Sequence, residues 1–130
     1  MATIFTKIVR GEIPCYKIAE DEKFLAFLDI NPLERGHTLV IPKKENDYIF
    51  DLDDETYTGL YLFSKKVARA LEKAVTCKRI AVAVLGLEVP HTHVHLIPMN
   101  DLGATNFTKP KLTFTKEEFE EIADKIKSFL

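Results

Sequence analysis

His91-Thr92-His93-Val94-His95-Leu96-Ile97 is the stretch that decides how this chain folds. The histidines alternate with Thr92, Val94 and Leu96, and such alternation is typical of a β-strand with one face toward the core. Pro98 follows directly and is expected to end the strand, since proline has no N–H to donate to a neighbouring strand. The sequence therefore predicts a strand over residues 91–97, with its histidines on one face.

Four more strands are predicted around this one. Two apolar stretches joined by the charged turn Asp21-Glu22-Lys23 indicate a hairpin. In the next strand, alternation places His37, Leu39 and Ile41 on one face. The last is apolar on both faces, which predicts a central place in the sheet. These strands are predicted over residues 16–20, 24–30, 36–42 and 79–85.

Three helices are predicted, two of them from apolar residues at three- and four-residue spacing. A short helix covers residues 4–10, and a long one runs from about residue 54 to residue 75, with Asp53 or Asp54 as its cap. The C-terminal helix begins at Thr115, which forms a capping-box pattern with Glu118. The inward positions of the two longer helices are Tyr57, Leu60, Tyr61, Ser64, Val67, Ala68, Leu71 and Val75, then Phe119, Ile122, Ala123, Ile126 and Phe129.

The 130 residues fit a single domain, 1–130, with one core. Apolar residues make up 46% and charged residues 29%, an ordinary globular balance. The predicted elements add up to an α+β fold: a mainly antiparallel sheet of about five strands with a long helix and a C-terminal helix, and with the helices on one side of the sheet.

Charge and hydropathy exclude several classes of partner. A net charge of -2 argues against binding nucleic acid by electrostatic attraction. The opening residues lack the apolar core of a signal peptide, and no apolar run reaches the roughly 18–20 residues that cross a membrane. Cys15 and Cys77 lie far apart without metal-binding spacing, which favours free buried thiols in a reducing compartment. We therefore expect a cytoplasmic protein with no nucleic-acid or membrane partner.

Three imidazoles on one strand face need an explanation, because each buried ring has polar nitrogens that need partners. Core packing alone explains a lone histidine better than three. A zinc site with His37 or Glu88 as a further ligand is a second possibility. However, His91 and His95 would lie about 13 Å apart on a straight strand, so at most two of the three could bind one ion.

Covalent catalysis is the remaining interpretation. A neutral imidazole is a good nucleophile near pH 7, and an acceptor on its other nitrogen fixes the tautomer. Flanking histidines can then donate to phosphate oxygens or to a leaving group. The middle position makes His93 the expected nucleophile on a nucleotide phosphorus.

At this point the sequence resembles the histidine triad (HIT) family of nucleotide hydrolases and transferases. The family motif alternates three histidines with apolar residues, and here Thr92 is the one soft mismatch. Three further blocks, residues 4–14, 25–32 and 36–43, look like other parts of the family pattern. Together the similar segments cover most of residues 3–98.

The resemblance implies a homodimer of α+β subunits that needs no cofactor. It implies cleavage of a phosphoramidate or phosphoanhydride bond of a purine nucleoside monophosphate derivative through a covalent nucleotidyl-histidine. By position, His93 is the nucleophile, His91 and His95 assist at the phosphate and leaving group, and His37 lies beside them. Asp29 matches the ribose-binding acid. The nucleobase pocket is assigned to Phe5, Ile8, Phe27, Ile30 and Leu39, for which core packing is the alternative.

Two departures from the family pattern matter. Many members hold a structural zinc ion with an N-terminal Cys-x-x-Cys, a later histidine and a triad-region histidine; here Thr3, Thr6 and Glu45 stand at the first three positions, so we predict no metal. Glu88 stands where a serine or threonine that contacts the phosphate is expected. A carboxylate there repels phosphate, so Glu88 is either a solvated loop residue or a recognition residue for a basic leaving group.

Two other functions stay open at the level of sequence. The shortened loop before the triad favours a nucleotide-binding or partner-binding module of the same fold with little catalysis. A metal-dependent hydrolase is the third candidate.

Overall fold

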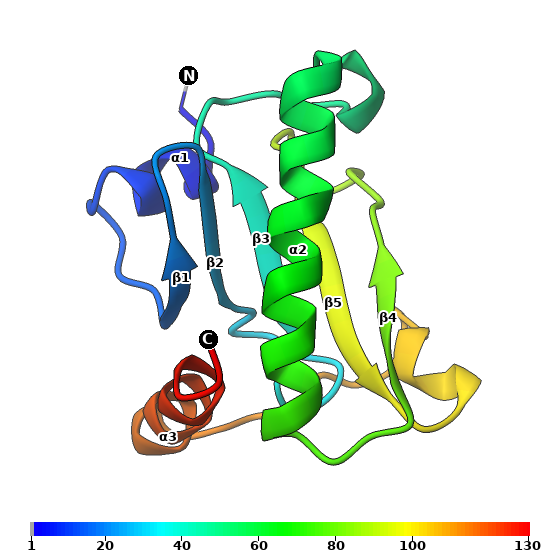
Figure 1. The fold of residues 1–130 in the computed structure, drawn as a ribbon. Helices are drawn as coiled ribbons and strands as arrows, with labels where there is room; N and C mark the ends of the chain where they lie inside the picture. The colour runs from blue at the N-terminus through cyan, green and yellow to red at the C-terminus, as the bar shows by residue number, and fades with distance from the viewer. Residues whose placement is uncertain (1) are drawn as a thin grey trace.

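Five antiparallel strands form one sheet in the computed structural model, which describes residues 2–130. The strands lie in the order β1-β2-β3-β5-β4 (Figure 1). Their bounds are β1 Lys17–Glu20, β2 Phe24–Leu28, β3 Thr38–Pro42, β4 Arg79–Ala83 and β5 Val94–Met99. The α+β prediction with about five strands is confirmed, as is the β1–β2 hairpin.

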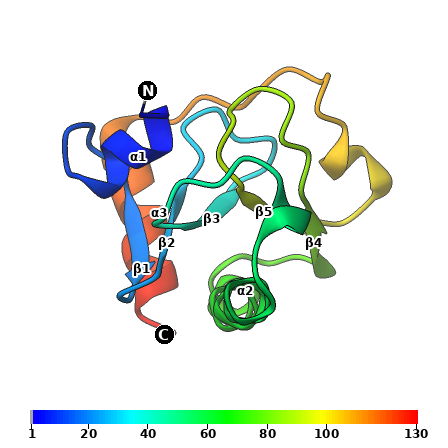
Figure 2. The same ribbon diagram turned by 90° about the horizontal axis from the view of Figure 1, so that it is seen from above.

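Helices cover both faces of this sheet. Figure 2 shows the long helix α2 and the C-terminal helix α3 on one face and the short helix α1 on the other. The prediction of helices on one side only is therefore wrong for α1. The bounds are α1 Ile4–Val9, α2 Asp54–Ala74 and α3 Lys116–Lys127, with short 3-10 helices η1 at Ile49–Asp51 and η2 at Leu102–Thr105.

The two faces bury separate apolar clusters because side chains alternate along each strand. The larger cluster lies under α2 and α3 and includes Val40, Val94 and Leu96. The smaller one lies on the α1 face and consists of Phe5, Leu25, Phe27, Leu39 and Ile41. His95 is the register partner of Leu39 in the β3–β5 ladder, so its side chain also belongs to the α1 face.

The strand predicted over residues 91–97 begins later than expected. β5 starts at Val94, and His91, Thr92 and His93 lie before it. Thr92 is nevertheless anchored, because its N–H donates to the Asn46 carbonyl at 2.6 Å. β5 also continues through Pro98, which the sequence analysis expected to end the strand. The observed β3 ladder ends at Leu96, so Pro98 pairs only with β4 and its missing N–H interrupts no ladder between two neighbours.

β4 lies at the edge of the sheet, so the prediction of a central strand was wrong. Apolar residues on both faces indicate what a strand can bury, but they do not say which strand lies beside it. Val82 on β4 is 55% exposed. Two predicted inward positions on the helices are also exposed, Tyr61 on α2 and Phe129 beyond α3.

The predicted helix starts are confirmed. The Asp53 side chain accepts from the N–H of Thr56 at the start of α2, and Thr115 and Glu118 form both bonds of a capping box on α3. Within residues 2–130, no helix combines the length and the apolar content that a membrane crossing needs.

Gly36 sets the turn that delivers His37 to the start of β3. Its φ of +88° is a left-handed conformation, and a Cβ there would lie 2.9 Å from Val75 Cγ2 and 3.0 Å from Leu71 Cδ1. Gly11 also has a positive φ, +79°, but a Cβ there meets nothing within 4 Å. Substitutions at these two glycines can therefore distinguish the energetic cost of backbone strain from that of overpacking.

Gly36→Ala is expected to lower the free energy of unfolding by about 2–4 kcal/mol, since left-handed strain and overpacking add together. The matched control, Gly11→Ala, is expected to cost only about 1 kcal/mol from backbone strain. Urea unfolding of both variants measures the difference. Equal losses would show that the α2 side chains move aside without cost.

Candidate active site

His93 has one ring nitrogen committed and the other available. Its Nδ1 lies 2.7 Å from the main-chain oxygen of His91. A carbonyl oxygen can only accept, so Nδ1 carries the proton and donates, and Nε2 keeps the lone pair. The rings of Phe5 and His95 each lie with their centroids 5.0 Å from that of His93, which fixes its orientation. Nε2 is therefore the nitrogen that can act as a nucleophile.

A backbone amide decides the protonation of two further histidines. The Leu33 N–H donates to His37 Nδ1 at 3.0 Å, so the proton of neutral His37 is on Nε2. His37 Nε2 in turn donates to His95 Nδ1 at 2.9 Å, which leaves the His95 proton on Nε2. His95 thus carries an N–H donor on its outer nitrogen, beside the nucleophile.

Burial keeps this pair neutral, which the tautomer argument requires. Burial lowers the pKa of His37 to about 3, and the nearby Lys111 charge acts in the same direction. Burial likewise lowers the pKa of His95 to about 3, although Asp29 opposes the shift. Both rings are therefore uncharged hydrogen-bonding groups near pH 7.

His91 is placed differently from its predicted role at the phosphate. The ring is fully buried, its Nε2 donates to the Pro42 carbonyl at 2.8 Å, and its Nδ1 lies 2.8 Å from Thr3 Oγ1. Both nitrogens are engaged, so the ring has no donor left for a substrate. Burial also lowers the pKa of His91, which favours the neutral ring. The part of His91 that reaches the nucleophile is its carbonyl oxygen.

Asp29 lies just after β2 at the edge of the histidine cluster. One carboxylate oxygen accepts from the Asn31 N–H at 2.8 Å, which is the bond of a local turn. The other oxygen lies 3.6 Å from His37 Nε2. The structure thus places Asp29 beside His37, and its sugar-binding role stays a prediction.

Four of the five predicted base-pocket residues share one apolar cluster, and Ile30 lies outside it. Phe27 and Leu39 are buried in the α1-face cluster, and Ile8 is half-buried against it. Phe5 belongs to the same cluster and also contacts the rings of His91 and His93. The side chain of Ile30 is 62% exposed and lies outside the cluster. Of the five, Phe5 is the one with ring contacts to the triad.

Glu88 is exposed in the loop before the triad, next to Leu87, which is 94% exposed. Within residues 2–130 it forms no ion pair or side-chain hydrogen bond. Recognition of a basic leaving group by Glu88 stays a prediction.

Two residues of the segment after β5 reach the site and were missed by sequence reasoning. The Phe107 ring packs edge-to-face with the His95 ring, with centroids 4.9 Å apart, and the Lys111 ammonium donates to the Phe107 carbonyl at 2.6 Å. An ion pair between Lys109 and Glu34 ties down the same segment. An aromatic residue in a polar loop carries no periodic signal, so only the path of the chain across the sheet could reveal it (Figure 2).

Neither candidate metal site has a suitable set of donors. Atoms of Asp29, His37 and His95 lie within 4.8 Å of one another. However, the Leu33 amide places a proton on His37 Nε2, the nitrogen that would have to ligate. The residues at the positions of the family zinc site are Thr3, Thr6 and Glu45, and two neutral hydroxyls do not replace thiolates as zinc ligands.

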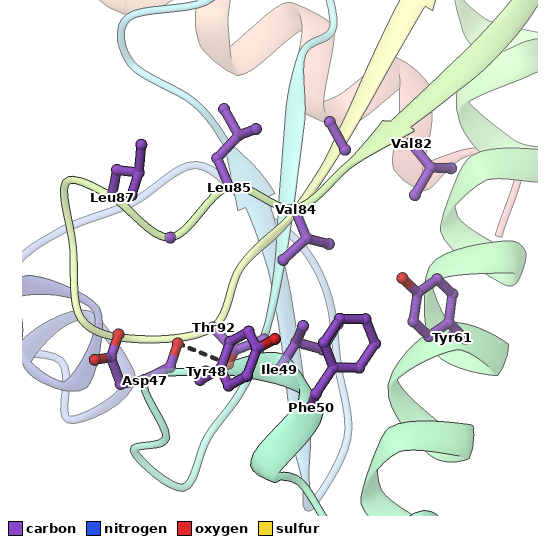
Figure 3. Close-up of a pocket in the computed structure, with 12 residues that line it drawn as sticks. Asp47, Tyr48, Ile49, Phe50, Tyr61, Val82, Val84, Leu85, Leu87 and Thr92 are labelled. Atoms are coloured by element: carbon purple, nitrogen blue, oxygen red, sulfur yellow. Dashed lines mark hydrogen bonds between the residues drawn. The ribbon is translucent and has the colours of Figure 1, made fainter.

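A separate open hollow of about 580 Å³ lies beside β4 rather than at the histidines. Figure 3 shows Val82 of β4, Val84 just after this strand, Tyr61 of α2, and Tyr48 and Phe50 around it. Thr92 lines it from the triad segment, and its hydroxyl donates to the Asp47 carbonyl at 3.3 Å. The hollow is therefore a largely apolar surface that is separate from the histidine cluster.

Known proteins are similar to this chain in both sequence and fold. The HIT domain family model matches residues 10–102. The chain is 38% identical over 133 residues to adenosine 5'-monophosphoramidase hnt1 of Schizosaccharomyces pombe, covering 98% of this chain and 100% of that protein.

Solved structures agree. A Hit-like protein involved in cell-cycle regulation from Bartonella henselae has a TM-score of 0.86 at 35% identity, covering 98% of this chain and 96% of that one. A Zn-bound histidine triad family protein from Mycobacterium smegmatis has a TM-score of 0.81 at 31% identity, covering 99% and 93%.

The buried, neutral His37 predicts a loss of stability in mild acid. The unfolded chain takes up the proton near the ordinary pKa of 6.5, whereas the folded state does so only near pH 3. The free energy of unfolding should therefore fall by about 1.4 kcal/mol per pH unit for this residue between those limits as the pH decreases. Urea unfolding at several pH values should show a correspondingly smaller slope in His37→Asn, which keeps an acceptor for Leu33. An identical slope in both proteins would contradict the assignment.

Proposed function

The chain belongs to the HIT domain family, and from this premise we propose that it is a nucleotide hydrolase with His93 as its nucleophile. The substrate class is a purine nucleoside 5'-monophosphate joined to its leaving group by a phosphoramidate or phosphoanhydride bond. The observation that carries the proposal is the tautomer of His93, whose Nδ1 is committed to the His91 carbonyl. A reactive Nε2 lone pair beside a second N–H donor suits attack on phosphorus.

In the first step, His93 Nε2 attacks the phosphorus, the nitrogen–phosphorus bond forms and the bond to the leaving group breaks. The ring gains positive charge, and its Nδ1–H bond to the His91 carbonyl stabilises that charge. The N–H of His95 is available to donate to a phosphate oxygen as charge develops. His37 keeps this donor in place by holding His95 Nδ1.

In the second step, water attacks the phosphorus and the bond to His93 breaks, which restores the Nε2 lone pair. For a phosphoramidate, the amine has already left in the first step with one proton taken up from solvent. The water of the second step supplies the oxygen of the released monophosphate and gives up two protons, one that replaces the proton used in the first step and one that converts the free amine to an ammonium ion. No other reactant is needed.

Recognition of the nucleoside is proposed for Asp29, beside His37, and for Phe5, beside His93. The Asp29 carboxylate can accept from sugar hydroxyls while one oxygen faces His37. Phe5 offers an aromatic edge next to the nucleophile. The name of the Schizosaccharomyces pombe relative, an adenosine 5'-monophosphoramidase, supports an adenosine substrate for this chain.

A binding module with little catalysis is the second candidate, and the exposed Glu88 favours it. A carboxylate in the loop before the triad offers no donor to phosphate oxygens. Nucleotide binding and turnover must therefore be measured separately.

His93→Ala is expected to abolish hydrolysis of adenosine 5'-phosphoramidate, lowering the rate at least about a hundredfold, because the covalent step is lost. Binding of adenosine 5'-monophosphate, measured by calorimetry, should change only a few-fold. Mass spectrometry after an acid-free quench should find the adenylyl group on the wild-type peptide that contains His93. A variant that kept most of the wild-type rate would exclude this mechanism.

We also propose that the chain forms a homodimer through the β4 edge. An edge strand presents unpaired backbone groups, and here it lies beside exposed apolar side chains. Val82 is 55% exposed, Leu85 51% and Leu62 of α2 62%. Pairing of two copies across this surface would bury these residues.

Val82→Lys combined with Leu85→Lys should shift the protein to a monomer in sedimentation velocity, because two desolvated charges oppose the contact. Leu102→Lys is the control, since Leu102 is 86% exposed and does not line the hollow beside β4. The same mass for all three proteins would remove this surface as the dimer interface.

A further inference from the structure

Three residues outside the triad form a connected hydrogen-bond network with the His91 ring. Thr3 Oγ1 lies 2.8 Å from His91 Nδ1 and 3.2 Å from Thr6 Oγ1. Thr6 Oγ1 donates to Glu45 Oε1 at 2.6 Å. The same carboxylate oxygen accepts from the Thr3 N–H at 3.0 Å. We name Thr3, Thr6 and Glu45 the Thr-Glu network.

The direction of each bond follows from the groups at the two ends. The Pro42 carbonyl can only accept, so His91 Nε2 carries the proton and Nδ1 must accept. Glu45 is an acceptor when ionised, so the Thr6 hydroxyl donates its hydrogen bond to Glu45. Thr6 Oγ1 then has no proton left to donate to His91. The Thr3 hydroxyl is then the donor that satisfies His91 Nδ1. Hydrogen bonds from Thr6 and Thr3 hold the pKa of Glu45 below its usual range, which keeps this end charged.

The network connects the surface to the nucleophile. Glu45 is exposed, Thr3 and Thr6 are 9% exposed, and the His91 ring is fully buried. The carbonyl of that same His91 holds His93 Nδ1 at 2.7 Å. A shift of the His91 ring that carries its main chain along therefore moves the group that fixes the reactive tautomer.

The network also anchors α1. Thr3 is the N-cap of this six-residue helix, and its hydroxyl accepts from the Thr6 N–H at 3.0 Å. Phe5 projects from α1 against both His91 and His93, with ring centroids 5.8 Å and 5.0 Å away. A helix this short has little stability of its own, so its position depends on such contacts.

From this connectivity we infer that Thr3, Thr6 and Glu45 are positioning residues for hydrolysis: they fix the His91 ring, and through the His91 carbonyl they hold His93 with Nε2 ready to react. In this chain hydroxyls and a carboxylate perform the task at the positions where zinc-binding relatives are expected to carry metal ligands. The inference rests on the proposed hydrolase function for its kinetic consequences, but the proton positions on the rings can be tested without it.

Two pairs of substitutions separate the hydrogen bonds from the bulk of the side chains. Thr3→Val removes the donor to His91 and is expected to lower kcat at least about tenfold, since small displacements of a reacting group have large effects on rate. Thr3→Ser keeps the hydroxyl and should stay within about twofold of wild type. Glu45→Ala should lower kcat in the same direction as Thr3→Val. Glu45→Gln keeps an acceptor oxygen and should restore most of the rate.

Thr115→Val provides a matched control. Thr115 is the N-cap of α3, so this variant also loses a helix cap, worth about 1 kcal/mol, without touching the histidines. It should lower stability and leave kcat unchanged when all proteins are assayed well below their melting temperatures. An equal effect on kcat from Thr3→Val and Thr115→Val, or from Glu45→Ala and Glu45→Gln, would overturn the inference.

A readout without substrate is the ring nitrogen NMR spectrum. Wild type should show His91 protonated on Nε2 and His93 protonated on Nδ1, and Thr3→Val or Glu45→Ala should convert His93 to a mixture of tautomers. Unchanged His93 tautomers in both variants would also overturn the inference. Wild-type protein with these ring signals but no hydrolysis would instead contradict the proposed function and leave the network in place.

Discussion

Main-chain groups that can only donate or only accept decide where the protons lie on the histidines. The Leu33 amide fixes His37 and, through it, His95, whereas the carbonyls of Pro42 and His91 fix the rings of His91 and His93. A side-chain partner could rotate or change its protonation, but a backbone amide or carbonyl in the folded protein does neither. The fold thus sets which ring nitrogens of the cluster donate and which accept, and it leaves one lone pair at His93 and one N–H donor at His95.

Antiparallel pairing of β3 with β5 brings the ends of β3 close to the histidines. His37 precedes β3 and Pro42 ends it, so the two ends of one short strand reach His95 and His91 respectively. The same pairing places Leu39 opposite His95 and closes the apolar cluster beneath α1. Burial then has a chemical consequence, because it holds the pKa of His37 and His95 far below neutral pH. The proposed nucleophile therefore works beside neutral donors rather than repelling cations.

Prediction from the sequence succeeded where the signal was local. The hairpin around residues 21–23, the capping box at Thr115 and the cap at Asp53 depend on neighbours a few residues away, and the structure confirms all three. It failed for β4, since apolar content does not reveal whether a strand lies at the centre or the edge of a sheet. The role given to His91 at the phosphate stays a prediction, but contacts distant in sequence decide how its ring is placed. Spacing placed its ring on the histidine face, but Pro42 and Thr3, distant in sequence, occupy both of its nitrogens.

The sequence by itself determined the strand at the end of the histidine run, the α+β class and the position of His93 as the middle histidine, because alternation and capping are encoded in adjacent positions. Only the tertiary structure decided which histidine nitrogen keeps its lone pair, which ring is buried out of reach of a substrate, and that Phe107, Thr6 and Glu45 belong to the same neighbourhood. Those properties arise from hydrogen bonds and ring contacts between residues that are up to 88 positions apart, as Thr3 and His91 are. Such contacts leave no periodic trace along the chain.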